Sequence, residues 1–166
     1  MSANEFDPRP ILDVLVAHEV DFVLIGGLAA IAHGSSRATF DLDVAYARSD
    51  ENLERLAGAL MDLGATLRGA QPGLPFRPDS QTLRRGLNFT FTTRAGPLDI
   101  LGEPAGAPRY EELRRRSSIE RISEVPIRVS SIDDLIAMKE AAGRPHDKVA
   151  AAELRVISDE LRAPRD

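Results

Sequence analysis

Two aspartates in the segment DLDV, Asp41 and Asp43, are separated by one residue inside an otherwise apolar stretch. On an extended strand both side chains would leave the same face, about 7 Å apart along the chain. Carboxylates this close repel each other and raise each other's pKa unless a cation lies between them. The pair therefore lies either in water on an edge strand or in a site for a divalent cation.

A third carboxylate, Asp99, lies between Leu98 and Ile100 in the segment GPLDILG. The flanking apolar residues predict a short strand whose acidic side chain points away from the core face. If this strand pairs beside the DLDV strand, the three carboxylates converge. Carboxylate oxygens are ligands of hard cations, Mg²⁺ or Mn²⁺ above all. For Asp99 alone, a solvated strand acid is the alternative.

A glycine pair, Gly26 and Gly27, lies upstream of the DLDV segment, between an apolar run and an alanine-rich stretch. This order predicts a buried strand that turns directly into a helix, whose first backbone N–H groups would suit phosphate oxygens. The segment is neither a Walker loop nor a G-x-G-x-x-G dinucleotide turn. A tight turn without a ligand is the alternative for the glycine pair alone.

Hydrophobic periodicity predicts the elements that position these residues. Helices are predicted over residues 8–20, 27–34, 50–64, 110–116, 131–143 and 145–161, and strands over residues 21–27, 38–47, 87–93, 97–101, 118–123 and 126–131. Residues 69–80, with three prolines and two glycines, predict a long loop. Within the strand over 38–47, period two places Phe40, Leu42 and Val44 in the core.

The order of elements predicts an α+β or α/β domain with a small mixed sheet flanked by helices and a short helical C-terminal tail. We expect a core over residues 1–130 and a helical tail over residues 131–166 packed on it. With 166 residues, the chain is about one domain long. No run of about eighteen apolar residues occurs, so we expect no membrane span.

Composition narrows the function classes further. The chain has no cysteine, which excludes disulfides, thiolate catalysis and cysteine-based zinc sites. Together with an N-terminus that lacks the basic-then-apolar order of a secretory signal, this favours the cytoplasm. The net charge of −5 speaks against a surface that binds nucleic acid everywhere. Two arginine clusters, in LRRG and LRRRSS, could contact RNA phosphates, although solvated surface charge is the ordinary interpretation.

The glycine pair and the two aspartates together indicate a function more specifically than either motif does alone. LIGG, the thirteen residues 28–40 and DLDV resemble the signature of the DNA polymerase beta-like nucleotidyltransferase superfamily, and LDIL lies where that family has its third acidic residue. The wording IAHGSSRATFDLDV and the tail SIDDLIAMKEAAGRPHDKVAAAEL are similar to its minimal bacterial branch, which includes the nucleotidyltransferase toxins of abortive-infection and toxin–antitoxin systems. The resemblance covers roughly residues 22–154 and implies the nucleotidyltransferase fold.

The resemblance implies roles for the motif residues. Asp41 and Asp43 would hold two divalent ions, Mg²⁺ or Mn²⁺, that bridge the triphosphate of a bound nucleotide. Asp99 would share one ion and help to deprotonate the attacking hydroxyl. Gly26 and Gly27 would offer backbone donors to the phosphates. Such a site suits phosphoryl transfer, which depends mainly on positioning and charge neutralisation.

Two cationic side chains are further site candidates, and the sequence differs from the family pattern at one position. Arg37, inside the motif, and Lys139, on a predicted tail helix, are candidates for contacts with the phosphates or base, and each could equally be a surface cation. Where relatives often have Asp-x-x-Asp after Arg-Pro, this chain has Asp147 followed by Ala150. The role of the tail helix in catalysis is therefore open.

The function predicted from this resemblance is the metal-dependent transfer of a nucleoside monophosphate from an NTP, such as ATP, to a hydroxyl. The acceptor would be an RNA such as tRNA, a protein side chain or a small molecule. A partner antitoxin or toxin chain, or a homodimer, would supply the surface that recognises it. Two alternatives are a non-catalytic nucleotide-binding regulatory partner with the same fold and an antibiotic-modifying nucleotidyltransferase.

Overall fold

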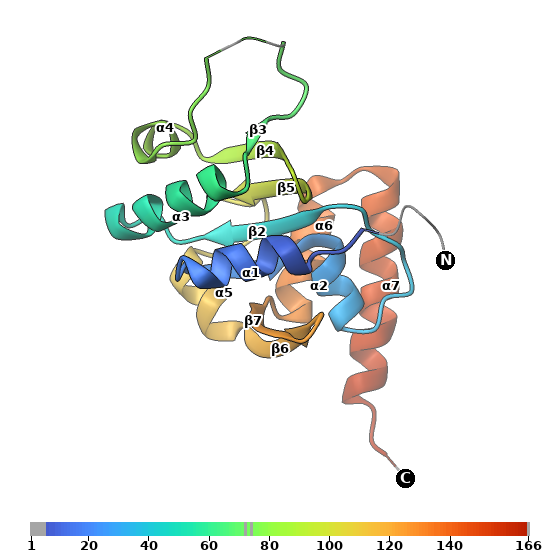
Figure 1. The fold of residues 1–166 in the computed structure, drawn as a ribbon. Helices are drawn as coiled ribbons and strands as arrows, with labels where there is room; N and C mark the ends of the chain where they lie inside the picture. The colour runs from blue at the N-terminus through green and yellow to red at the C-terminus, as the bar shows by residue number, and fades with distance from the viewer. Residues whose placement is uncertain (1–5, 72, 74, 166) are drawn as a thin grey trace.

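The computed structural model describes residues 6–71, 73 and 75–165, and these residues form a mixed sheet flanked by helices (Figure 1). The helices are α1 (Arg9–Ala17), α2 (Gly26–Ala32), α3 (Asp50–Asp62), α4 (Ser80–Arg85), α5 (Tyr110–Arg116), α6 (Ile132–Ala142) and α7 (Pro145–Arg162). The strands are β1 (Phe22–Ile25), β2 (Leu42–Tyr46), β3 (Thr66–Leu67), β4 (Asn88–Thr93), β5 (Gly96–Leu101), β6 (Ser118–Ile122) and β7 (Val125–Val129). The predicted α+β class is confirmed.

Local sequence signals explain where the longer helices begin and end. The Ser49 hydroxyl accepts a hydrogen bond of 3.2 Å from the Asn52 N–H at the start of α3, and Gly64 follows its end with φ +62°. Ser131 caps α6 in the same way, accepting from the Asp134 N–H at 3.2 Å. Such caps satisfy backbone donors that the first helical turn leaves without partners, and each contributes about 1 kcal/mol.

The strands form one sheet in the order β3-β4-β5-β2-β1-β7-β6. The hairpins β4–β5 and β6–β7 are antiparallel, and β1 pairs antiparallel with β2. Two long-range pairings, β2 with β5 and β1 with β7, are parallel. Strands β2 and β5 therefore run side by side, with their acidic segments in register.

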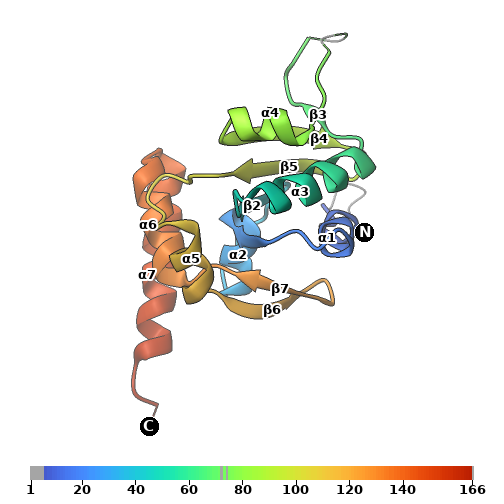
Figure 2. The same ribbon diagram turned by 90° about the vertical axis from the view of Figure 1, so that its left-hand side faces the viewer.

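Helices cover the sheet on two sides. In Figure 2, α1 and α3 lie on one side of the sheet, and α6 and α7 lie on the other. Side chains at alternate positions of β2 and β5 are fully buried in the core: Leu42, Val44, Leu98 and Ile100. The intervening positions, Asp43 and Asp99, therefore point to the opposite face of the sheet, toward α2 and α6.

The predicted strand over 38–47 begins later than expected, at Leu42. The prediction that Phe40 lies in the core is wrong, because this residue is 64% exposed. It precedes the strand, so the alternation of faces along a strand does not apply to it. Leu42 and Val44 are buried as predicted.

The region between β3 and β4 is partly as predicted. Residues 69–71, 73 and 75–79 contain no helix or strand, which confirms the loop for these positions, whereas residues 72 and 74 lie outside the described part of the chain. Two short elements were not predicted: strand β3 and helix α4. Asp79 starts α4 by accepting a hydrogen bond of 2.9 Å from the Thr82 N–H.

The C-terminal residues form two helices, α6 and α7, which pack against each other, and α6 also contacts α2. Helix α7 begins at Pro145, as predicted, because proline lacks the N–H that a first helical turn would leave unpaired. Among the described residues, no helix combines the length and apolarity that crossing a membrane requires. Residues 1–5, part of the N-terminal stretch considered above, lie outside the described residues.

Candidate active site

Three carboxylates converge where β1, β2 and β5 lie side by side. The parallel register places Asp43 directly opposite Asp99, and Asp41 lies just before the start of β2. One oxygen from each of the three side chains lies within 4.8 Å of the other two. The convergence expected from the sequence therefore occurs, and it depends on the pairing of two strands that are distant along the chain.

The electrostatics of this cluster centre on Asp43. Burial raises its pKa from 3.8 to about 7, and the charges of Asp41 and Asp99 add to the increase. The nearby Lys139 acts in the opposite direction. Negative charge is therefore incompletely neutralised at this position, as expected of carboxylates that share a cation site.

Asp41, Asp43 and Asp99 are called the triad. Gly26 permits the close approach of α2 to this triad. Its φ is +72°, a left-handed conformation that glycine adopts without strain. A Cβ atom at this position would lie 2.1 Å from Asp43 Oδ2. At Gly27, a Cβ would lie 2.7 Å from Thr39 Oγ1. The glycine pair is thus required by packing against the acidic segment.

Two neighbouring side chains orient the outer carboxylates of the triad. Thr39 donates a hydrogen bond of 3.3 Å from Oγ1 to Asp41 Oδ1. Arg68, which follows β3, donates at 2.8 Å to Asp99 Oδ1 and at 2.7 Å to the Phe91 carbonyl. Sequence reasoning missed Arg68, because an arginine at the edge of a predicted loop carries no signal of a partner 31 residues away.

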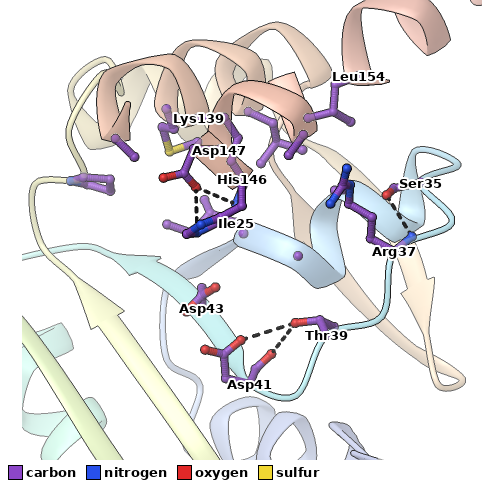
Figure 3. A pocket seen from close by; sticks show the side chains of 18 of the residues that line it. Ile25, Ser35, Arg37, Thr39, Asp41, Asp43, Lys139, His146, Asp147 and Leu154 are labelled. Carbon is purple, nitrogen blue, oxygen red and sulfur yellow. Dashed lines mark hydrogen bonds and ion pairs between the residues drawn. The ribbon is translucent and has the colours of Figure 1, made fainter. Parts of the chain in front are cut away.

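The triad lies at one side of a pocket of about 620 Å³. The pocket is bounded by α2 and the segment before β2 on one side, and by α6 and α7 on the other (Figure 3). All residues that the sequence singled out for the site contribute to its lining: Gly26, Gly27, Arg37, Asp41, Asp43, Asp99 and Lys139. The fold thus brings them together around one space.

The wall opposite the triad carries a buried acid, Asp147, whose side chain is 1% exposed. Burial alone would raise the pKa of Asp147, but the hydrogen bond and charge of Arg144, assisted by Lys139 and His146, hold it below its usual value. Lys139 Nζ lies 3.7 Å from Asp147 Oδ1, and both residues line the pocket. In Figure 3 they face Asp41 and Asp43 across the pocket.

Most of the other arginine side chains that the sequence analysis considered form ion pairs with acidic residues. Arg37 lies at the pocket wall, and its Nε donates to Glu153 Oε2 on α7 at 3.1 Å. The two arginine clusters considered for RNA are largely engaged in surface ion pairs: Arg84 with Asp50, Arg114 with Asp21, Arg115 with Glu112, and Arg116 with Glu112 and Asp134. Solvated and paired surface charge is therefore the better interpretation of both clusters.

The triad fits a divalent cation. It offers carboxylate oxygens only, which Mg²⁺ and Mn²⁺ prefer, and no cysteine is present to favour a softer metal. The raised pKa of Asp43 indicates that an added positive charge would stabilise the ionised cluster. The open pocket beside the carboxylates leaves room for further ligands such as phosphate oxygens.

Comparison with known proteins agrees with this geometry. A family model described as "Nucleotidyl transferase AbiEii toxin, Type IV TA system" matches residues 11–148. The lincosamide antibiotic adenylyltransferase LnuA, solved with lincomycin bound, is 15% identical over 93% of this chain and 99% of that chain, with a TM-score of 0.61. The antibiotic-resistance factor ANT(2'')-Ia is 16% identical over 92% and 90% of the two chains, with a TM-score of 0.54. A search of curated protein sequences finds no match. At these identities the structural likeness concerns the fold, and it confirms the predicted nucleotidyltransferase fold.

Proposed function

Since this chain belongs to the AbiEii nucleotidyl transferase toxin family and is a nucleotidyltransferase, we propose that it transfers a nucleoside monophosphate from an NTP to a hydroxyl in a metal-dependent reaction. The observation that carries this proposal is the triad itself. Three carboxylates, on or directly before two adjacent strands, lie beside a glycine turn and open into a pocket large enough for a nucleotide.

We assign the binding roles as follows. Asp41, Asp43 and Asp99 would hold divalent ions, Mg²⁺ or Mn²⁺, which supply positive charge to the triphosphate and to the attacking oxygen. Gly26 and Gly27 bring the backbone close to the triad, and their N–H groups would face the phosphates. Cationic side chains at the pocket wall, Arg37 and Lys139, would neutralise phosphate charge or contact the base.

The transfer itself forms a bond between the acceptor oxygen and the α-phosphorus and breaks the bond between the α-phosphorus and the oxygen that leads to the β-phosphate. Pyrophosphate is the leaving group. Asp99 would accept the proton of the attacking hydroxyl at the carboxylate oxygen that Arg68 does not engage. Because the site mainly positions charged groups, its rate depends on how rigidly the triad is held.

The acceptor would be an RNA such as tRNA, a protein side chain or a small molecule. In a family described as part of type IV toxin–antitoxin systems, we propose that this chain is the toxin half, acting in the cytoplasm with an antitoxin chain as its counterpart. The helical tail over residues 131–166, which contributes Lys139 and Asp147 to the pocket wall, would act as one unit with the core over residues 1–130.

The decisive experiment is incubation of the protein with each α-labelled NTP and Mg²⁺ in a mixture of total RNA and cytoplasmic protein. We expect label from one preferred NTP to become covalently attached to a discrete product. Nuclease and protease treatment, followed by sizing, would identify the acceptor. In a parallel incubation with a γ-labelled NTP, label should leave with pyrophosphate, so label from the γ-phosphate attached to the product would contradict the proposed bond cleavage.

A control without divalent ions separates transfer from binding. With EDTA present, no label should be transferred, whereas Mg²⁺ added back should restore transfer. Transfer that continues in EDTA would contradict the metal-dependent mechanism. Saturable NTP binding without transfer to any RNA, protein or small-molecule acceptor would favour the non-catalytic alternative.

The raised pKa of Asp43 predicts how metal binding depends on pH. Protons compete with the cation for this carboxylate, and its pKa of about 7 places the competition near neutrality. The increase in melting temperature caused by Mg²⁺ should therefore grow between pH 5.5 and pH 8. Differential scanning calorimetry with Mg²⁺ and with EDTA at each pH measures this increase. An increase that is the same at every pH would show that Asp43 is not a ligand.

A further inference from the structure

Glu153, on the tail helix α7, is hydrogen-bonded to three consecutive residues of the segment that precedes the triad. Its Oε1 accepts from the Ser35 hydroxyl at 2.7 Å and from the Ser36 N–H at 3.3 Å, and its Oε2 accepts from Arg37 Nε at 3.1 Å. The Ser35 bond is the largest of the effects that hold the pKa of Glu153 below its ordinary value. The carboxylate therefore stays ionised at neutral pH.

The segment that Glu153 contacts, residues 33–41, is called the α2–β2 loop here. Within the described residues, the backbone N–H groups of residues 36–40 donate to no backbone carbonyl. Apolar burial does not replace these bonds, because Phe40 is exposed. The contacts with Glu153 are therefore a principal anchor of the first half of this loop.

The second half of the α2–β2 loop leads directly to the triad. Thr39 packs against Gly27 and donates to Asp41 Oδ1. Ser35, Arg37, Ala38, Thr39 and Asp41 all line the pocket. A displacement at Ser35 or Ser36 would pass along only a few residues of chain before it reached Thr39 and Asp41. The position of Glu153 is thus coupled to the shape of the site.

One face of helix α7 contacts both the pocket and the α2–β2 loop. Ala150 and Leu154 line the pocket, and Ile157 lies beside Gly34 at the start of the loop. With Glu153, these residues follow helical spacing along one face of α7. The second acid of the family pattern is absent at position 150, where this chain has Ala150, whereas Glu153 lies one turn further along and contacts the loop.

We propose that Glu153 is a positioning residue, which holds the α2–β2 loop against α7 and thereby places Thr39, Asp41 and Arg37 for the binding of the metal and nucleotide. This inference rests on the proposed function, since it concerns the same pocket. It gives the C-terminal helix a definite task in the reaction without direct contact between Glu153 and the reacting atoms.

The test compares Glu153→Ala and Glu153→Gln with Glu160→Ala. Glu160 lies on the same helix, is exposed, and forms no ion pair within the described part of the chain, so it is a matched control. Hydrogen exchange of the peptides that cover residues 35–41 reports on the loop whether or not the protein is active. A Mn²⁺ titration followed by electron paramagnetic resonance reports on the triad without any nucleotide.

We expect Glu153→Ala to speed amide exchange in the loop by about tenfold, because it removes charge-assisted hydrogen bonds. The dissociation constant for Mn²⁺ and the KM for the NTP should rise by about three- to tenfold, with a smaller change in kcat. Glu153→Gln keeps an acceptor for Ser35 and Ser36 but loses the acceptor for Arg37 Nε, so its effects should lie between those of the wild type and those of Glu153→Ala. Glu160→Ala should match the wild type in all of these measurements.

Unchanged loop exchange in a folded Glu153→Ala protein would overturn the proposal. Faster exchange without any change in Mn²⁺ affinity or KM would also overturn it, because the anchoring of the loop would then not affect the binding of the metal or the nucleotide. A Glu153→Gln protein as impaired as Glu153→Ala would contradict the assignment of the anchor to Ser35 and Ser36. If no protein transfers label, the proposed function fails, while the exchange and Mn²⁺ measurements still decide the role of Glu153.

Discussion

Asp43→Asn is expected to reduce nucleotide transfer by about a thousandfold or more, while it makes the metal-free protein more stable above neutral pH. Asparagine preserves the shape of the side chain but removes the charge that would hold the divalent ion. Asp43 lies between the other two carboxylates of the triad, so its loss removes the central ligand. Transfer of α-labelled nucleotide measures the first effect, and chemical denaturation in EDTA measures the second.

The sign of the stability change follows from the direction of the pKa shift. Because folding raises the pKa of Asp43 from 3.8 to about 7, the stability of the folded protein decreases as pH rises through this interval. At pH 4 the carboxyl group is largely protonated in the folded state, and Asp43→Asn should change the free energy of unfolding little. At pH 8 the substitution removes a partly buried negative charge, and we expect a gain of about 2 to 4 kcal/mol.

Asp159→Asn provides the matched control for this prediction. Asp159 is exposed on α7 and does not line the active-site pocket, so transfer and stability should stay close to those of the wild type. A stable Asp43→Asn protein that retains full Mg²⁺-dependent transfer would refute the metal site. Destabilisation at pH 8 would instead show that the carboxylate is better compensated in the folded protein than the geometry indicates.

The elements that follow a strong local pattern could be predicted from the sequence. The period-two alternation of β2 and β5 predicts that Asp43 and Asp99 leave the core face, and the spacing of apolar residues predicts α3 and α6. The pairing of β2 with β5 was only a condition in that reasoning, because β4 separates these strands in sequence and joins β5 in a hairpin. Convergence of the triad is thus a consequence of sheet topology that local patterns cannot specify.

The residues that orient the triad could not be predicted. Arg68 and Glu153 are common surface types, and their partners lie 31 and 116 to 118 residues away along the chain. Phe40 shows the opposite difficulty, since an apolar residue in phase with a strand was expected inside, yet the strand begins two residues later. Periodicity indicates which face a residue occupies only where the element has already formed.

Gly26→Ala is the second substitution with a large expected effect, because two separate penalties fall on one position. An alanine with φ near +72° costs about 1 kcal/mol of backbone strain. In addition, the new Cβ would lie 2.1 Å from Asp43 Oδ2 and 2.8 Å from Asp43 Cβ and Cγ. Contacts this short cannot persist, so α2 or the Asp43 side chain must move.

Gly64→Ala separates these two penalties. Gly64 has a similar backbone conformation, with φ +62°, but a Cβ there would meet no atom within 4 Å. The control should therefore lose only about 1 kcal/mol of stability and retain transfer within about twofold. Gly26→Ala should lose about 2 to 4 kcal/mol and reduce transfer by about a hundredfold or more, since small displacements of catalytic groups have effects of this size.

The difference between the two glycine variants decides what the glycine turn contributes. If Gly26→Ala and Gly64→Ala lose equal stability and both retain transfer, the contact between α2 and Asp43 is not needed for the reaction. If Gly26→Ala alone loses transfer and also weakens Mn²⁺ binding, the turn is required to hold the central carboxylate in place. We expect the second result, because the clash falls on the Asp43 carboxylate itself, and its displacement would change the spacing of the three carboxylates on which a shared cation site depends.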